Sequence, residues 1–280
     1  MTTTPSHPFH LEAVTKRYAA FALGPLDLVA PRGYVTGLVG ANGAGKTTAI
    51  KIALGAVRPD AGQARLLDKT RVGVVLDRPY WQPDWRVRDV ARLLAPFYPG
   101  WQQTIFDELA DWAGVTPRTR VRDFSRGAGM KMQLAVALAH GAELLVLDEP
   151  TSGLDPLARS ELLDRLAEFM THERHAVVFS THITSDLERI ADALVVLDRG
   201  KAVASGMRDE VLASWAMVRG PAAALTPELR RRVRGLREHT VGWEGLLAAE
   251  DLELCSPDVV AEPPSIEELL VYLAKEERHA

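Results

Sequence analysis

Uninterrupted apolar runs alternate along the chain with segments of helical periodicity. The runs have the length of strands and few polar residues, which is typical of strands buried on both faces of a parallel sheet. They lie at residues 34–39, 71–76, 144–147, 176–179 and 194–197. The helical segments lie at residues 49–54, 87–94, 104–113, 130–139, 156–170 and 185–190. Because strands that alternate with helices build βαβ units, the pattern predicts an α/β fold around a parallel sheet.

Three regions lie outside this alternation. Residues 9–18 alternate in the way of an edge strand, and residues 23–29 and 63–67 add strands for a small antiparallel β subdomain. Aromatic residues and helical periodicity dominate from residue 79 to about 140, which predicts a helical insert. We therefore expect a main domain over residues 9–214 and a small accessory region over residues 215–280.

The hydrophobic pattern weakens in the accessory region. Residues 226–237 hold five arginines, and we interpret them as a solvated helix face rather than as a lipid or nucleic-acid site. Ser265 and Glu268 have the spacing of a capping box, which predicts a last helix that extends to about residue 277.

The residues from Gly40 to Thr48 carry the pattern G-x-x-x-x-G-K-[ST] between a predicted strand and a predicted helix. In that context the pattern indicates a phosphate-binding P-loop, because glycines let backbone N–H groups wrap around phosphate oxygens at a helix N-terminus. Lys46 is predicted to reach the β- and γ-phosphates, and Thr47 to bind Mg²⁺. The candidate nucleotide-binding residues of this loop are Gly40, Asn42, Gly43, Gly45, Lys46, Thr47 and Thr48.

The apolar run at residues 144–147 ends in Asp148 and Glu149. A carboxylate that follows a parallel strand lies at the carboxyl edge of the sheet, where ligands bind in open α/β folds. On its own such a strand end is commonly only a polar terminus, but here it follows a P-loop. Asp148 is therefore a candidate Mg²⁺ ligand, and Glu149 is the candidate group that orients or deprotonates an attacking water.

Several segments, in this order along the chain, resemble the motifs of ABC ATPases. Tyr18 stands where that family has an aromatic residue that stacks on adenine, and residues 124–128 (FSRGA) stand where it has its L-S-G-G-Q signature. Residues 147–156 (LDEPTSGLDP) resemble the Walker B and D-loop segment, and residues 180–182 (STH) resemble the switch-histidine segment. The resemblance covers about residues 9–210.

The resemblance implies a dimer that encloses two molecules of Mg²⁺-ATP. Ser125 and Gly127 of one subunit would contact the γ-phosphate bound at Lys46 of the other. His182 would contact the γ-phosphate and join Lys46 and Glu149 as a catalytic residue, and Asp155 would act across the dimer interface. The chain has one P-loop and one signature, so it needs either a second copy or a similar subunit to complete a site.

Two positions depart from the family pattern. Asp77 ends the strand predicted at residues 71–76, where the family usually has glutamine. It is a candidate Mg²⁺ ligand, or else only a turn residue before Pro79. Arg126 replaces the first glycine of the signature, where it either adds a cation near the nucleotide or, as we expect, points to solvent, while Ala128 replaces its glutamine.

Composition limits the partners. The chain has 280 residues, of which 47% are hydrophobic and 25% charged, which is ordinary for a globular protein with a sizeable core. A net charge of −4 provides no basic field for nucleic acid or an anionic membrane, and the single Cys255 excludes an internal disulfide framework and a cysteine metal cluster. No stretch approaches 18 consecutive apolar residues, so we expect any membrane part to belong to another chain.

The resemblance therefore implies the cytoplasmic Mg²⁺-ATPase subunit of an exporter for drug, peptide or lipid, held at the inner face of the cell membrane by a separate permease. In this interpretation most aromatic rings near residues 80–85 form the core of the insert, and one or two remain for docking to the permease. A soluble ABC-type ATPase of translation or DNA maintenance is the alternative, but the chain has a single uninterrupted cassette and no sustained heptads. A regulatory binder without hydrolysis is a third hypothesis, against which Lys46, Asp148, Glu149 and His182 argue.

Overall fold

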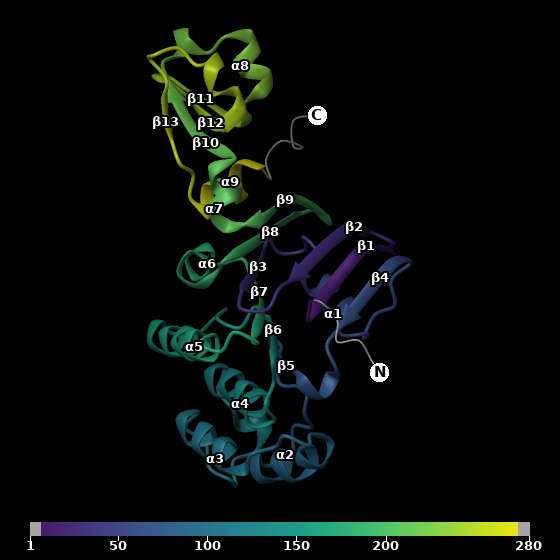
Figure 1. The fold of residues 1–280 in the computed structure, drawn as a ribbon. Helices are drawn as coiled ribbons and strands as arrows, with labels where there is room; N and C mark the ends of the chain where they lie inside the picture. Colours follow the sequence, from purple (N-terminus) through teal and green to yellow (C-terminus); the bar gives the residue numbers. More distant parts are fainter. Residues whose placement is uncertain (1–6, 274–280) are drawn as a thin grey trace.

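A six-stranded sheet forms the centre of the molecule, as a computed structural model of the chain shows for residues 7–273 (Figure 1). Its strands lie in the order β5 (Val72–Val75), β6 (Leu144–Asp148), β7 (Ala176–Thr181), β3 (Val35–Val39), β8 (Ala193–Asp198) and β9 (Lys201–Met207). The first five are parallel, and every residue of β3, β6 and β7 is buried, so the predicted α/β fold is confirmed. The antiparallel strand β9 was not predicted, because it is an exposed edge strand without an apolar run.

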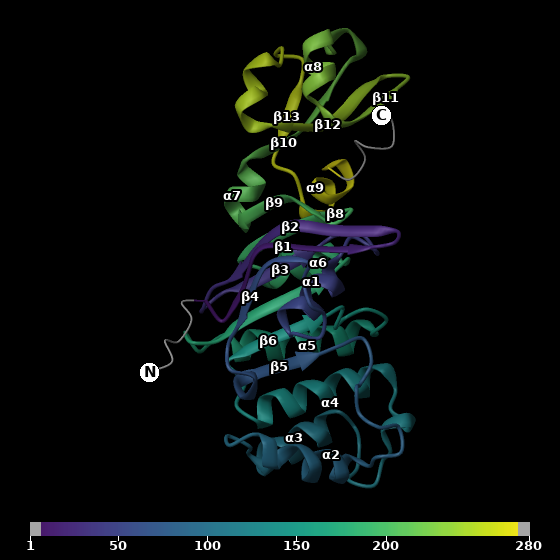
Figure 2. The same ribbon diagram turned by 90° about the vertical axis from the view of Figure 1, so that its right-hand side faces the viewer.

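Different layers cover the two faces of this sheet (Figures 1 and 2). Helices α4 (Arg126–Ala139), α5 (Pro156–Phe169) and α6 (Thr184–Ile190) pack against the face that includes Leu145 and Leu147. Helix α1 (Lys46–Ala53) and a three-stranded antiparallel sheet pack against the face that includes Leu144 and Val146. Since successive side chains of a strand point to opposite faces, one apolar run supplies both cores.

The three-stranded sheet has the order β2 (Phe21–Ala30), β1 (Phe9–Tyr18) and β4 (Ala61–Leu66). The expected antiparallel subdomain is present, but the prediction of β1 as an edge strand is wrong. It is the central strand, paired with a neighbour on each side. Alternation reports only that one face of a strand is buried, as Phe9 and Leu11 are, and it carries no information about neighbours in the sheet.

The helical insert consists of α2 (Val87–Leu94), α3 (Gln103–Trp112) and the outer face of α4. Trp81 and Phe106 are buried in its core, with Trp85 and Trp101 packed against them. Tyr80 is 51% exposed and Phe97 is 72% exposed. Most of the aromatic residues therefore form the core of the insert, as expected, and two lie at its surface. Short 3-10 helices lie at Lys69–Arg71, Ala95–Phe97, Val121–Asp123, Ala222–Ala224 and Ala249–Leu254.

His140, at the end of α4, makes the stability of the protein sensitive to acid. Its ring is buried and stacks on Tyr98 with centroids 4.2 Å apart, and this desolvation lowers the pKa of His140 to about 4. Below pH 6.5 the unfolded chain binds a proton here that the folded protein excludes, so stability falls as pH falls from about 6.5 to 4. We expect a loss of about 2–3 kcal/mol over this interval in urea unfolding, because one pKa unit corresponds to about 1.4 kcal/mol.

The control for this prediction is His140→Phe, which keeps the stacked ring and cannot titrate. Nδ1 of His140 has no hydrogen-bond partner among residues 7–273, so phenylalanine leaves no polar group unpaired at that atom. An equal loss of stability in His140→Phe and in the unmodified protein between pH 6.5 and 4 would contradict the assignment.

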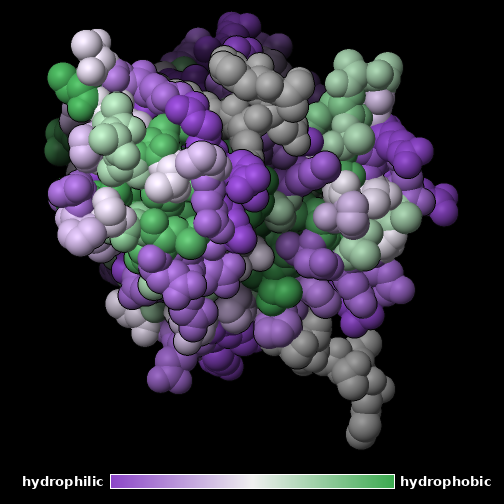
Figure 3. Space-filling model, turned by 90° about the horizontal axis from the view of Figure 1, so that it is seen from above, coloured by the Kyte–Doolittle hydropathy of each residue, from purple (hydrophilic) through white to green (hydrophobic). Residues whose placement is uncertain are grey.

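The accessory region contains a four-stranded antiparallel sheet that the sequence did not predict. Its order is β11 (Arg234–His239), β12 (Gly242–Ala248), β10 (Trp215–Gly220) and β13 (Val260–Glu262). Charged residues hide the strand pattern, as where Arg237 pairs with Glu244 across β11 and β12. Viewed from the end that this region forms, the surface is mostly hydrophilic with small scattered hydrophobic patches (Figure 3).

The interpretation of residues 226–237 as one helix face is wrong. Helix α8 is Pro227–Arg232, and β11 then begins at Arg234. Charge pairing explains three of the five arginines, since Arg230 pairs with Glu238, Arg232 with Asp251 and Arg237 with Glu244.

The helices that flank the accessory sheet connect it to the main core. Helix α7 (Arg208–Ala213) precedes the sheet, and α9 (Ile266–Leu273) packs on α6. The capping box of Ser265 and Glu268 is confirmed, while the predicted extension to residue 277 lies outside the described residues. Within residues 7–273, no helix has the length and apolarity that a membrane crossing requires.

Candidate functional site

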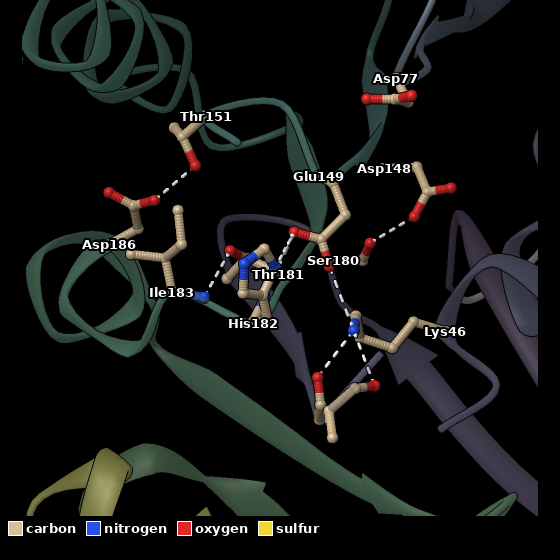
Figure 4. Close-up of polar contacts among 12 residues, drawn as sticks. Lys46, Asp77, Asp148, Glu149, Thr151, Ser180, Thr181, His182, Ile183 and Asp186 are labelled. Atoms are coloured by element: carbon tan, nitrogen blue, oxygen red, sulfur yellow. Dashed lines mark hydrogen bonds and ion pairs between the residues drawn. The ribbon is translucent and has the colours of Figure 1, made fainter. Parts of the chain in front are cut away.

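The candidate residues Lys46, Asp148, Glu149 and His182 converge at the carboxyl edge of the central sheet (Figure 4). Strands β6, β7 and β3 are neighbours and parallel, so the segments that follow them leave the sheet at the same edge. The P-loop follows β3, Asp148 ends β6 and His182 follows β7. The strand order therefore brings together motifs that lie about a hundred residues apart in the sequence.

The geometry of the P-loop fits an anion. Gly40 lies so close to β8 that an added Cβ would come within 2.3 Å of the carbonyl oxygen of Leu197. Gly45 has a φ of 111° and directly precedes α1, and no side chain of residues 7–273 caps that end of the helix. The N-terminus of α1 therefore has backbone N–H groups and a dipole that could receive a phosphate.

Lys46 lies beneath this loop with an exposed fraction of 5%. Its Nζ donates to the carbonyl oxygens of Gly40, at 2.7 Å, and Ala41, at 3.3 Å, and lies 3.1 Å from Oε1 of Glu149. A buried ammonium requires such negatively polarised partners. The carboxylate of Glu149 thus holds the lysine at the place where the motif predicts phosphate oxygens.

Asp148 accepts hydrogen bonds on both carboxylate oxygens. Thr47 Oγ1 donates to Oδ2 at 2.8 Å, and Ser180 Oγ donates to Oδ1 at 2.6 Å. Thr47 and Asp148 therefore present hard oxygen ligands side by side, the donor set that Mg²⁺ prefers. Ser180 was not among the candidate site residues, although it belongs to the STH run, and it fixes the orientation of the carboxylate.

Glu149 connects the other two candidate catalytic residues, Lys46 and His182. Oε2 lies 2.7 Å from Nδ1 of His182 and accepts from its backbone N–H at 3.3 Å, while Oε1 faces Lys46. The backbone of Glu149 has a φ of 52°, a left-handed conformation that is costly for a residue with a side chain. Such strain is found where the position of a side chain matters for function.

Tyr18 lies at the end of β1, with 47% of its surface exposed. Its ring stacks with Phe21 at a centroid distance of 6.4 Å, and Phe21 lies against the P-loop, since a Cβ on Gly45 would be 2.9 Å from Phe21 Cζ. Tyr18 thus has an exposed ring near the loop. Phe21 was missed, because nothing in its local sequence distinguishes it from a core residue.

The signature and D-loop residues lie at two helix starts. Ser125 caps α4 by accepting from Ala128 N–H, and Asp155 caps α5 by accepting from the N–H groups of Leu157 and Ala158. A Cβ on Gly127 would lie 3.7 Å from Leu154, so the two helix starts are close. Within residues 7–273, neither Ser125 nor Gly127 hydrogen-bonds to Lys46, Asp148 or Glu149.

Asp77 and Arg126, the two departures from the family pattern, form an ion pair with each other. The side chain of Arg126 is 43% exposed, so it points to solvent as expected, and the ion pair forms at the surface. Asp77 lies at the same sheet edge as Asp148, because β5 pairs with β6 in a register that matches Val75 with Leu147. A carboxylate at that edge attracts the guanidinium from the start of α4.

A buried ionic network joins the segments that follow β6 and β7. Asp186 is fully buried, and it accepts from Thr151 Oγ1 and from Arg159 Nε, each at 2.5 Å. Arg159 also donates to Ser185 Oγ at 2.7 Å. The sequence did not predict this network, because an aspartate in the first turn of a short helix usually faces water.

Comparisons with known proteins show the family to which the chain belongs. Residues 23–152 match the family described as ABC transporter. An uncharacterized ABC transporter ATP-binding protein of Nostoc sp. is 34% identical over 67% of this chain and 60% of its own length. The chain thus spans about three fifths of the length of that relative. The Nod factor export ATP-binding protein I of Cupriavidus pinatubonensis is 32% identical over 73% of this chain and 67% of its own.

Further similarity extends into the accessory region. The bacitracin transport ATP-binding protein BcrA of Enterococcus faecalis is 31% identical over 86% of this chain and 77% of its own length. A solved structure described as the ATP-binding subunit of an ABC transporter is 26% identical, with a TM-score of 0.64 over 72% of this chain and 90% of its own. On these findings the chain belongs to the ABC transporter ATP-binding proteins, a family of ATPases.

Proposed function

We propose that this chain is an ATP-hydrolysing subunit that dimerises around Mg²⁺-ATP and drives a separate membrane permease that exports a drug, peptide or lipid. The position of Glu149 carries the proposal, because this carboxylate lies between Lys46 and His182 and follows Asp148 directly. A base beside a phosphate-binding lysine is the arrangement that phosphoryl transfer to water requires.

The roles of the residues follow from their contacts. The P-loop and Lys46 bind the phosphates, and the lysine exchanges its contact with Glu149 for phosphate oxygens. Glu149 is then free to orient a water and accept its proton, while His182 holds the carboxylate through the contact at Nδ1. Exposed Tyr18 provides the adenine contact.

Thr47 and Asp148 would hold Mg²⁺, since their oxygens are 2.8 Å apart and Ser180 already orients the carboxylate. The bound cation would neutralise charge on the phosphates during transfer.

Dimerisation is supported by the lack of hydrogen bonds, within residues 7–273, between the signature residues and the P-loop and Walker B residues of the same chain. Ser125 caps the N-terminus of α4, and within the described part of the chain neither Ser125 nor Gly127 hydrogen-bonds to Lys46, Asp148 or Glu149. We infer that they complete the site of a partner, which would be a second copy of this chain.

A mixing experiment tests the shared site. Lys46→Ala and Ser125→Ala should each abolish ATP hydrolysis, because every site of either homodimer lacks one half. In a mixed dimer, one site receives Lys46 from one subunit and Ser125 from the other. An equal mixture should therefore recover up to about a quarter of the wild-type rate, with half of the dimers mixed and one good site in each. Mixtures that stay inactive while the unmodified protein hydrolyses ATP would contradict a shared site.

The permease partner and the location at the inner face of the cell membrane rest on the relatives, which are transport and export ATP-binding proteins by name. Exposed Phe97 and Tyr80 on the helical insert provide an apolar surface for such a contact. Gentle solubilisation of native membranes and purification of the tagged chain should yield a polytopic membrane protein in near-equal amount. Ribosomes or DNA-repair proteins in its place would favour the soluble-ATPase alternative, which these relatives do not favour.

A further inference from the structure

The ion pair between Asp77 and Arg126 lies at the carboxyl edge of the sheet, after the strand that pairs with the one ending in Asp148. Asp77 follows β5 by two residues, and Asp148 ends the neighbouring strand β6. Asp77 Oδ1 is engaged by Arg126 Nη2, and the two side chains are 53% and 43% exposed. A carboxylate in this place is a natural ligand for a divalent cation, yet in this structure its partner is the guanidinium.

The pair is held by a larger contact between α4 and the end of β5. The side-chain amide of Gln133 accepts from Leu76 N–H at 3.0 Å and donates to the Leu76 carbonyl at 2.9 Å. Gly129 packs on Pro79, where an added Cβ would lie 3.1 Å from Cγ. Residues 126, 129 and 133 lie on one face of α4. This face of the helix therefore lies along the segment from Leu76 to Pro79.

The stem of Arg126 is confined as well. A Cβ on Gly153 would lie 3.2 Å from both Cδ and Nε of Arg126. The guanidinium is therefore positioned before it meets Asp77, which reduces the entropy that the pair loses on closing.

We propose that Arg126 competes with Mg²⁺ for Asp77, so that the ion pair lowers the affinity of the nucleotide site for the cation. The inference rests on the proposed function, and in it Arg126 acts as a positioning residue. Solvent exposure makes the exchange possible: an exposed pair changes partners at small cost, whereas a buried pair such as Arg159 and Asp186 does not.

The competition predicts that the same factor governs two independent measurements, the Mg²⁺ affinity and the stability of the fold. If the pair is closed in most molecules, removing Arg126 should raise the Mg²⁺ affinity by the same factor by which the pair stabilises the fold. Measured energies of exposed pairs place that factor at about two- to fivefold.

The experiment uses the unmodified chain, Arg126→Gln, Asp77→Asn and the double variant. Urea unfolding without nucleotide or Mg²⁺ gives the coupling between the two positions, expected to be about two- to fivefold in the unfolding equilibrium constant. Thermal unfolding with a non-hydrolysable ATP analogue gives the Mg²⁺ concentration for half-maximal stabilisation. We expect Arg126→Gln to lower that concentration about two- to fivefold, and the two variants that lack Asp77 to share one value.

Arg122→Gln is the matched control, because Arg122 is a nearby exposed arginine paired with Asp84 and its loss changes net charge equally. It should leave the Mg²⁺ midpoint unchanged. The inference is overturned if Arg126→Gln leaves the midpoint unchanged, or lowers it equally when Asp77 is absent. If the analogue and Mg²⁺ do not stabilise even the unmodified chain, the proposed function itself fails.

Discussion

Glu149→Gln is expected to lower the rate of ATP hydrolysis by at least about 100-fold and to accumulate an ATP-bound dimer. The amide keeps the size of the side chain but cannot accept a proton from water, and loss of a general base typically costs 10²–10⁴-fold. Nucleotide binding should persist, because the P-loop and Lys46 remain and a negative charge beside the phosphates is removed. Phosphate release and sedimentation with Mg²⁺-ATP measure the two effects.

Glu168→Gln serves as the control for this substitution, since Glu168 is an exposed residue of α5 whose carboxylate pairs with Arg165. It should hydrolyse ATP at the unmodified rate and should not accumulate the dimer. Equal phosphate release by Glu149→Gln and the unmodified chain would show that Glu149 is not the base.

Contiguous motifs made the central fold, the P-loop and the position of Asp148 at the sheet edge predictable from the sequence. The P-loop needs a strand, a glycine loop and a helix in direct succession, and all its determinants lie between residues 34 and 54. Asp148 was predictable because an apolar run ends in it, and parallel strands place such ends at one edge. These inferences need only residues that are close together in the sequence.

The contacts that the sequence did not predict join residues far apart in the chain. Asp77 and Arg126 were interpreted separately, one as a cation ligand or turn residue and the other as a solvated side chain, although they neutralise each other. Nothing in the local sequence distinguishes Ser180 and Asp186 from other polar residues. Only the fold, through β7 and α6, places them beside Asp148 and Arg159. The accessory sheet was not predicted for a related reason: charge pairs between its strands replace the alternation of apolar and polar residues.

Arg159→Ala is expected to destabilise the protein by about 2–3 kcal/mol in urea unfolding. It removes the cationic partner of Asp186, whose carboxylate has no exposed surface and keeps Thr151 as its other hydrogen-bond partner. Breaking a buried pair costs about 3–5 kcal/mol, and we reduce that figure because the side chain of Arg159 is 30% exposed. Arg189→Ala is the control at the same interface of α5 and α6, since its pair with Asp164 is exposed and should contribute less than about 1 kcal/mol.

A double variant separates the charge from the packing of Arg159. Asp186→Asn removes the buried charge, so adding it to Arg159→Ala should recover part of the lost stability. If each variant only lost packing contacts independently, the two losses in the free energy of unfolding would add instead. The network also connects Thr151, just after Glu149, to the helix that begins two residues after His182. If Arg159→Ala costs no more than Arg189→Ala, the buried pair does not hold these two segments together, and the position of His182 beside Glu149 must depend on the strands alone.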